Sequence, residues 1–172
     1  INVAEKGSLT LQVIGKAEGG HSSMPSSKSS VGYLAEAILK LENNPVPGKL
    51  EGISLALFDE VSKQMPFQYK ILFANLWLFE PLINNFLSDS PTMNAVIRTT
   101  TAPTMLSASN RLNVLASEAV GTVNFRLHPR DNPEKIINFV KDLISNENIE
   151  VKNLSAGTLA SSVSDWETEG YR

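Results

Sequence analysis

The sequence holds few side chains that could serve as acids, bases or metal ligands. It contains two histidines, His21 and His128, and no cysteine. The lack of cysteine excludes thiolate zinc ligands, iron–sulfur clusters and cysteine nucleophiles. A catalytic zinc site commonly takes three protein ligands with histidine among them, so two isolated histidines argue against a complete zinc site. Phosphate-binding glycine loops, H-E-x-x-H and G-x-S-x-G are also missing.

The strongest candidate for chemistry is His21, within Gly19-Gly20-His21-Ser22-Ser23-Met24-Pro25. Glycine lets the backbone turn sharply and approach a ligand closely, and functional side chains concentrate in loops. An imidazole at this position is able to stabilise a developing oxyanion by hydrogen bonding. The same residues also form an ordinary turn, in which His21 would be a solvent-exposed bystander.

A second candidate combines Asn113 with Arg126, which falls on the polar face of a predicted strand. An amide and a guanidinium fork together bind a carboxylate, because the arginine supplies paired donors. The alternatives are an Arg126 paired with a neighbouring acid and an Asn113 that caps a turn. His128 lies two residues after Arg126 and could join its face, but we favour a surface histidine.

Hydrophobic periodicity predicts the elements that must position these residues. Alternation of apolar and polar residues is typical of half-buried strands, whereas apolar residues at helical spacing predict amphipathic helices. The predicted strands cover residues 9–13, 95–107, 118–128 and 149–151, and the predicted helices cover 30–42 and the segment from 133 onward. Asn132 is the expected N-cap of the second helix, with Pro133 at its first position. Pro103 implies an edge strand or a bulge.

The order of these elements predicts an α+β fold of the ferredoxin-like, split βαβ type. A four-stranded antiparallel sheet would carry two helices on one face. Residues 51–93 are rich in aromatic side chains and predict a helical insertion between the first helix and the second strand, either as extra core or as a pocket for an acyl chain. We assign residues 1–155 to this domain and residues 156–172, which lack apolar periodicity, to a tail.

Composition narrows the possible partners. The chain has 172 residues, 42% of them hydrophobic and 19% charged, with a net charge of −3, which is ordinary globular composition for one domain. A mildly acidic chain lacks the basic surface of a nucleic-acid binder. No apolar run approaches the length of a membrane span. The sequence does not indicate the cellular compartment of the protein.

Several short motifs in a fixed order resemble the dimerisation (lid) domain of a zinc metallopeptidase family. That family contains aminoacylase, carboxypeptidase G and succinyl-diaminopimelate desuccinylase, and the similarity is greatest to its carboxypeptidase S-like branch. Besides the loop of His21, the motifs are Glu5-Lys6-Gly7, Asn75-Leu76-Trp77-Leu78-Phe79, Arg98-Thr99-Thr100-Thr101-Ala102, Asn113-Val114-Leu115 and Val123-Asn124-Phe125-Arg126. The resemblance covers residues 3–154. Ala116 departs from it, since proline usually follows Asn-Val-Leu there.

The resemblance implies a lid that completes an active site held elsewhere. In the family, a separate catalytic domain binds two zinc ions, and the lid pairs with its twin as a homodimer. His21 matches the histidine that stabilises the tetrahedral intermediate in the opposite subunit. Asn113 and Arg126 match the residues that bind the substrate's carboxylate. We therefore expect a hydrolase of peptides or N-acyl amino acids, no metal bound by this chain, no activity of the fragment alone, and a tail that returns to the absent catalytic domain.

Two other functions stay open. One is a stand-alone ferredoxin-like binding domain; an RNA binder of this shape needs aromatic residues on the sheet face and a basic surface. The other is a purely structural dimerisation module in which His21 has no catalytic role. Pairing of exposed sheet edges would make a two-fold dimer in either case.

Overall fold

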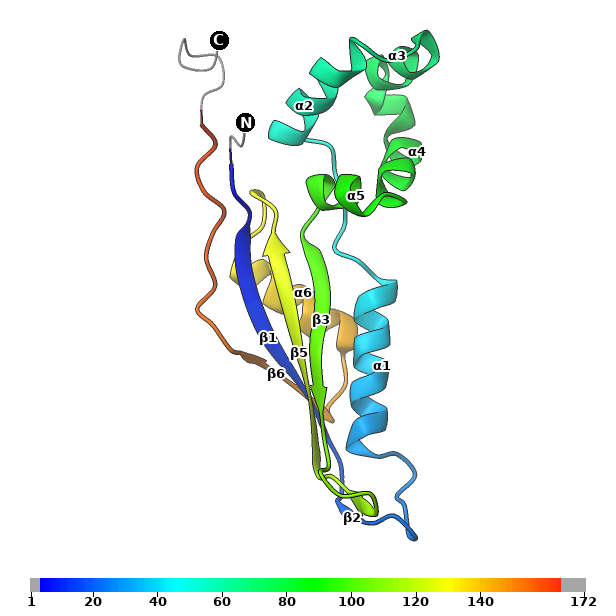
Figure 1. Cartoon of the computed structure of the whole chain (residues 1–172), viewed down its shortest axis with the longest axis vertical. Helices are drawn as coiled ribbons and strands as arrows, with labels where there is room; N and C mark the ends of the chain where they lie inside the picture. Colours follow the sequence, from blue (N-terminus) through cyan, green and yellow to red (C-terminus); the bar gives the residue numbers. More distant parts are fainter. Residues whose placement is uncertain (1–3, 165–172) are drawn as a thin grey trace.

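Four strands form the central sheet, in the spatial order β3-β5-β1-β6 with every neighbouring pair antiparallel (Figure 1). They are β1 (Gly7–Lys16), β3 (Thr100–Ser107), β5 (Glu118–Leu127) and β6 (Ile149–Asn153). The computed structural model describes residues 4–164. Strand β5 lies between the parallel strands β1 and β3, as a split βαβ unit requires. The predicted α+β fold is confirmed.

Helices α1 (Ser30–Asn43) and α6 (Pro133–Ile144) cover one face of this sheet. Side-chain oxygens cap both helices: Ser29 accepts from the Gly32 N–H, and Asn132 accepts from the Lys135 N–H as predicted. The shared core consists of apolar side chains from alternate strand positions and from one stripe of each helix. Its fully buried members include Leu9, Leu11, Val13, Leu41, Val123, Phe125, Leu127, Ile136 and Val140.

Four helices between α1 and β3 form a separate layer beyond one end of the sheet (Figure 1). They are α2 (Ile53–Ser62), α3 (Phe67–Ala74), α4 (Leu76–Ser88) and α5 (Pro91–Ile97). A second core lies among them, built around Leu50, Phe58, Ile83, Leu87 and Ile97. Several aromatic residues therefore supply extra core, while Phe67, Trp77 and Phe86 stay largely exposed.

The start of β3 corrects one prediction. Residues 95–97 were expected to be strand because of their β-branched side chains, but they form the last turn of α5, and β3 begins at Thr100. Pro91 occupies the first helical position after Ser90, and Ile97 is fully buried in the second core. Helix initiation and burial outweigh strand propensity here. The pairing register shifts between Pro103 and Met105, so the expected irregularity at this edge strand is confirmed.

Two further pairings lie outside the four central strands. Strands β2 (Gly20–His21) and β4 (Val114–Leu115) pair as a small sheet of their own at the opposite end from the helical insertion (Figure 1). After β6 the chain continues alongside β1, where Ser8 and Thr158 exchange backbone hydrogen bonds of 2.9 and 2.7 Å. The first part of the predicted tail thus pairs with the sheet; residues 165–172 lie outside the described residues. Within residues 4–164, no helix has the length and apolarity to cross a membrane.

Candidate functional site

His21 lies at an exposed tip of the molecule. It pairs with Val114 across the two-stranded sheet, while Gly20 pairs with Leu115. This sheet continues beyond the last paired residues of β1 and β5, Lys16 and Glu118 (Figure 1). The imidazole is therefore presented outward, where another molecule can reach it.

The two glycines before His21 have different surroundings. A Cβ on Gly19 would lie 3.0 Å from the Leu115 carbonyl oxygen and 3.2 Å from the Ser117 nitrogen, whereas a Cβ on Gly20 would meet nothing within 4 Å. Neither glycine adopts a positive φ. The glycine pair does not form the sharp turn that we expected. Gly19 instead allows the close approach of β4, the strand that directly follows Asn113.

The imidazole of His21 has a defined set of neighbours. Its Nδ1 atom accepts the Ser23 N–H at 3.2 Å and lies 2.8 Å from Ser23 Oγ. With Nδ1 as acceptor, the proton of a neutral imidazole resides on Nε2. Nε2 in turn lies 3.4 Å from Nδ2 of Asn113. A rotation of this amide group by 180° exchanges its oxygen and nitrogen, which places an acceptor beside Nε2. His21 and Asn113 thus form one polar group, a partnership that the sequence spacing did not reveal.

Arg126 lies at the other end of the sheet. It pairs with Ser8 of β1 and Thr100 of β3, whereas Glu118, at the start of the same strand, is next to the tip. Eight residues of extended strand separate the levels of Glu118 and Arg126, or roughly 26 Å. The expected receptor made of Asn113 and Arg126 is therefore not assembled within one copy of this chain.

A surface depression surrounds the exposed Arg126. Its volume is about 320 Å³, and its lining includes Lys6, Ser8 and Thr158. The Lys6 ammonium donates to the carbonyl oxygens of Ala95 at 2.9 Å and Arg98 at 2.8 Å. Burial lowers the pKa of Lys6 to about 8; Asp131 opposes this shift, whereas Arg126 adds to it. The end of the sheet that holds Arg126 therefore concentrates basic groups.

The second histidine is not the surface residue that we expected. His128 is only 4% exposed. It shares a sheet face with Arg126, but residues of the helical insertion cover it. Burial lowers the pKa of His128, and the nearby Arg130 guanidinium lowers it further.

No metal centre is found in the part of the chain that the structure describes. Residues 4–164 contain no group of three or more histidine, aspartate or glutamate side chains placed to hold an ion. The residues present therefore do not fit the two zinc ions implied by the resemblance.

This α+β domain, with a polar tip and a basic opposite end, matches the family model described as "Peptidase dimerisation domain" (M20_dimer) over residues 3–152. The chain belongs to the M20 peptidase dimerisation domain family. The predicted family is confirmed.

Its relatives are hydrolases. The chain is 43% identical over 155 residues to probable carboxypeptidase S-like 2 of Dictyostelium discoideum, covering 90% of this chain and 30% of that protein. It is 37% identical over 174 residues to human N-fatty-acyl-amino acid synthase/hydrolase PM20D1, covering 100% of this chain and 35% of that protein. The chain thus spans about a third of the length of these relatives. Human carnosine dipeptidase 1 shares the fold, with a TM-score of 0.55, 11% identity, and coverage of 99% of this chain and 42% of that one.

Proposed function

We propose that this chain is the dimerisation and lid module of a zinc-dependent amide hydrolase, a carboxypeptidase or N-acyl-amino-acid hydrolase. The observation that carries the proposal is the separation of the polar groups. His21 and Asn113 share one exposed tip, whereas Arg126 lies at the far end of the same strand system. One copy cannot bring these groups to one substrate, but two copies can. The two zinc ions would be bound by parts of the protein outside this chain, so the isolated module is inactive.

His21 acts in this proposal as a hydrogen-bond donor to an oxyanion. The contact between Nδ1 and Ser23 keeps the proton on Nε2, the ring atom that faces away from its own loop backbone. A positioned donor of this kind stabilises the charge that develops as an amide carbonyl becomes tetrahedral. Asn113 beside it orients the ring and supplies a second polar contact.

Arg126 binds the substrate's carboxylate. Its exposed guanidinium provides two parallel donors, which match the two oxygens of a carboxylate. A terminal carboxylate is the feature common to peptides cleaved by carboxypeptidases and to N-acyl amino acids. These are therefore the substrates that we propose.

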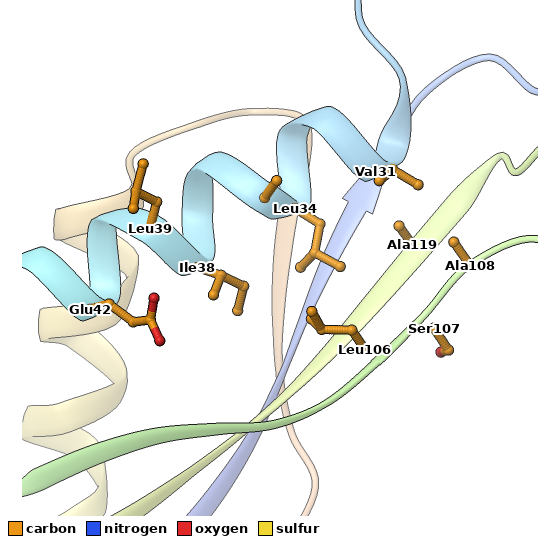
Figure 2. A pocket seen from close by; sticks show the side chains of 10 residues that line it. Val31, Leu34, Ile38, Leu39, Glu42, Leu106, Ser107, Ala108 and Ala119 are labelled. Carbon is orange, nitrogen blue, oxygen red and sulfur yellow. The ribbon is translucent and has the colours of Figure 1, made fainter.

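The partner in the dimer is a second copy bound along β3. The outer edge of β3 is unpaired within residues 4–164, and exposed edges pair readily with another strand. A groove of about 500 Å³ lies between α1 and the end of β3 (Figure 2). Its apolar side chains include Val31, Leu39 and Leu106, which are 50%, 56% and 65% exposed. Burial of this surface against its own copy would stabilise the dimer.

Antiparallel pairing of β3 with its copy would bring the two halves of the site together. A two-fold axis across this edge reverses the direction of the second copy. The tip with His21 and Asn113 in one copy then lies beside the end with Arg126 in the other. Each composite site would take Arg126 from one subunit and His21 from its partner.

Mixed dimers test this arrangement. Full-length His21→Ala and Arg126→Ala subunits, each with a different affinity tag, are co-expressed, and the dimers that carry both tags are isolated. One site of such a dimer has both residues intact and the other lacks both, so we expect about half of the wild-type activity per dimer. The two homodimeric variants serve as controls.

The same experiment separates the alternatives. If both residues served one site from the same subunit, or if His21 had no role, the mixed dimer would not exceed the average of its two parent homodimers. Such a result would contradict the composite site and favour a purely structural dimerisation module. A stand-alone binding domain would show no effect of either substitution on hydrolysis.

A further inference from the structure

A cavity of about 390 Å³ lies where the helical insertion meets the sheet. The side chains of Ile53 and Leu57 from α2, and of Ala95 and Val96 from α5, give it a mainly apolar lining. The polar residues of its wall are Glu5, Lys6, Ser54 and His128. Cavities of this size with an apolar lining and a few polar groups are typical small-molecule sites.

The cavity adjoins the depression around Arg126. Glu5 and Lys6 line both of them. Arg126 and His128 are two residues apart and point to the same side of β5 and its continuation. A molecule bound to the Arg126 guanidinium would therefore lie next to the apolar cavity.

His128 is buried in this wall without its full set of hydrogen bonds. Its Nδ1 atom accepts the Arg130 N–H at 3.4 Å, so the neutral ring carries its proton on Nε2. Nε2 has no hydrogen-bond partner among residues 4–164. This atom has almost no accessible surface, so His128 closes the wall of the cavity and offers no contact to a ligand.

We propose that the cavity is the specificity pocket for the side chain beside the substrate's carboxylate. The inference rests on the proposed role of Arg126 as the carboxylate ligand. Once Arg126 holds the carboxylate, the next carbon of the substrate carries the amino-acid side chain, and the cavity adjoins that position. The acyl group lies on the other side of that carbon, attached through the nitrogen of the scissile amide. The pocket therefore selects amino acids with large apolar side chains.

The test compares two leucines of α2 that are similarly exposed but differently placed. Leu57 lines the cavity and is 47% exposed, whereas Leu55 is 38% exposed and does not line it. Full-length Leu57→Trp and Leu55→Trp enzymes are assayed with N-acylphenylalanine and N-acylglycine that carry the same acyl chain. We expect Leu57→Trp to lower the ratio of kcat/KM for the phenylalanine and glycine substrates about tenfold or more. Leu55→Trp should leave this ratio unchanged.

A third variant separates this proposal from the proposed function. Arg126→Ala should raise the KM of both substrates. Suppose that Arg126→Ala raises both KM values, but Leu57→Trp lowers the two kcat/KM values equally or lowers neither of them. The cavity is then occupied by another part of the protein, and the pocket assignment is wrong. If Arg126→Ala leaves both KM values unchanged, the proposed carboxylate site itself is wrong, whatever the result with Leu57→Trp.

Discussion

Asn113 and His21 are neighbours in space although 92 positions separate them in the sequence, with 3.4 Å between Asn113 Nδ2 and His21 Nε2. The pairing of β2 with β4 brings them together. Arg126 belongs to the same ordered set of sequence motifs as Asn113, but it lies at the opposite end of the domain. The polar residues of this domain therefore divide into two groups, so the roles that we propose for them can be tested separately.

Substitution of His21 should affect turnover. In the full-length enzyme we expect His21→Ala to lower kcat by about 10²–10³-fold with little change in KM, because an oxyanion contact strengthens only in the transition state. Met24→Ala, in the same loop and also exposed, is the matched control and should retain normal turnover. Near-normal kcat of His21→Ala would contradict the catalytic role.

Substitution of Arg126 should affect substrate binding. Arg126→Ala removes charged hydrogen bonds worth roughly 1.5–3 kcal/mol, so we expect KM to rise about 10–150-fold. Arg126→Lys should recover part of this loss, since lysine keeps the charge but not the paired geometry. The check is a substrate whose carboxylate is replaced by a carboxamide. An equal loss of affinity for that substrate would argue against a carboxylate contact.

The groove beside β3 predicts how the dimer can be broken. Leu106→Glu puts a charge into a surface that we expect to be buried in the dimer, and should raise the dimer dissociation constant about tenfold or more. Leu112→Glu is the control, because Leu112 is fully exposed and does not line the groove. Light scattering over a range of protein concentrations measures both variants. A dimer unaffected by Leu106→Glu would place the interface elsewhere.

A buried carboxylate beside the basic end should make stability depend on pH. Burial alone would raise the pKa of Asp131, but hydrogen bonds from Lys135 Nζ at 2.6 Å and Thr99 Oγ1 at 2.5 Å outweigh it and hold the pKa below its usual value. Since the folded state favours the ionised form, this stabilisation is present above the unfolded pKa near 4 and is lost as the pH falls through the folded pKa.

We therefore expect Asp131→Asn to reduce the free energy of unfolding by about 1–3 kcal/mol at neutral pH. The difference from wild type should shrink as the pH falls below about 4. Asp142→Asn, at an exposed position of α6, should change stability little at any pH. Denaturant titrations at several pH values measure these differences. A constant difference between Asp131→Asn and wild type at all pH values would contradict the assignment.

The elements that the sequence predicted well are those with a local signal. The alternation in β1 and β5 and the cap of α6 at Asn132 depend on residues close together in the chain, and the structure has them as expected. The sheet order followed from the order of these elements. The last turn of α5, residues 95–97, was predicted as strand because the burial of Ile97 in the second core depends on distant residues.

The site depends even more on contacts between distant segments. The pairing of His21 with Asn113 comes from a two-residue ladder that has no periodic signal, and the burial of His128 comes from the insertion lying across the end of the sheet. His21, Asn113 and Arg126 were selected by motif, and a motif contains no information about which of its residues meet in space.

The chain enters and leaves this domain through adjacent segments. The Ser161 N–H donates to the Glu5 carbonyl oxygen at 2.9 Å, and the Glu5 N–H donates to Ser161 Oγ at 2.8 Å. A larger protein attached through both segments would hold the sheet only at this end, and the end with His21 would be unattached. The ten residues of β1 span roughly 33 Å, so a rotation of about 10° at this attachment would move the histidine tip by about 6 Å. Small rotations at the attachment would thus move His21 relative to whatever it faces.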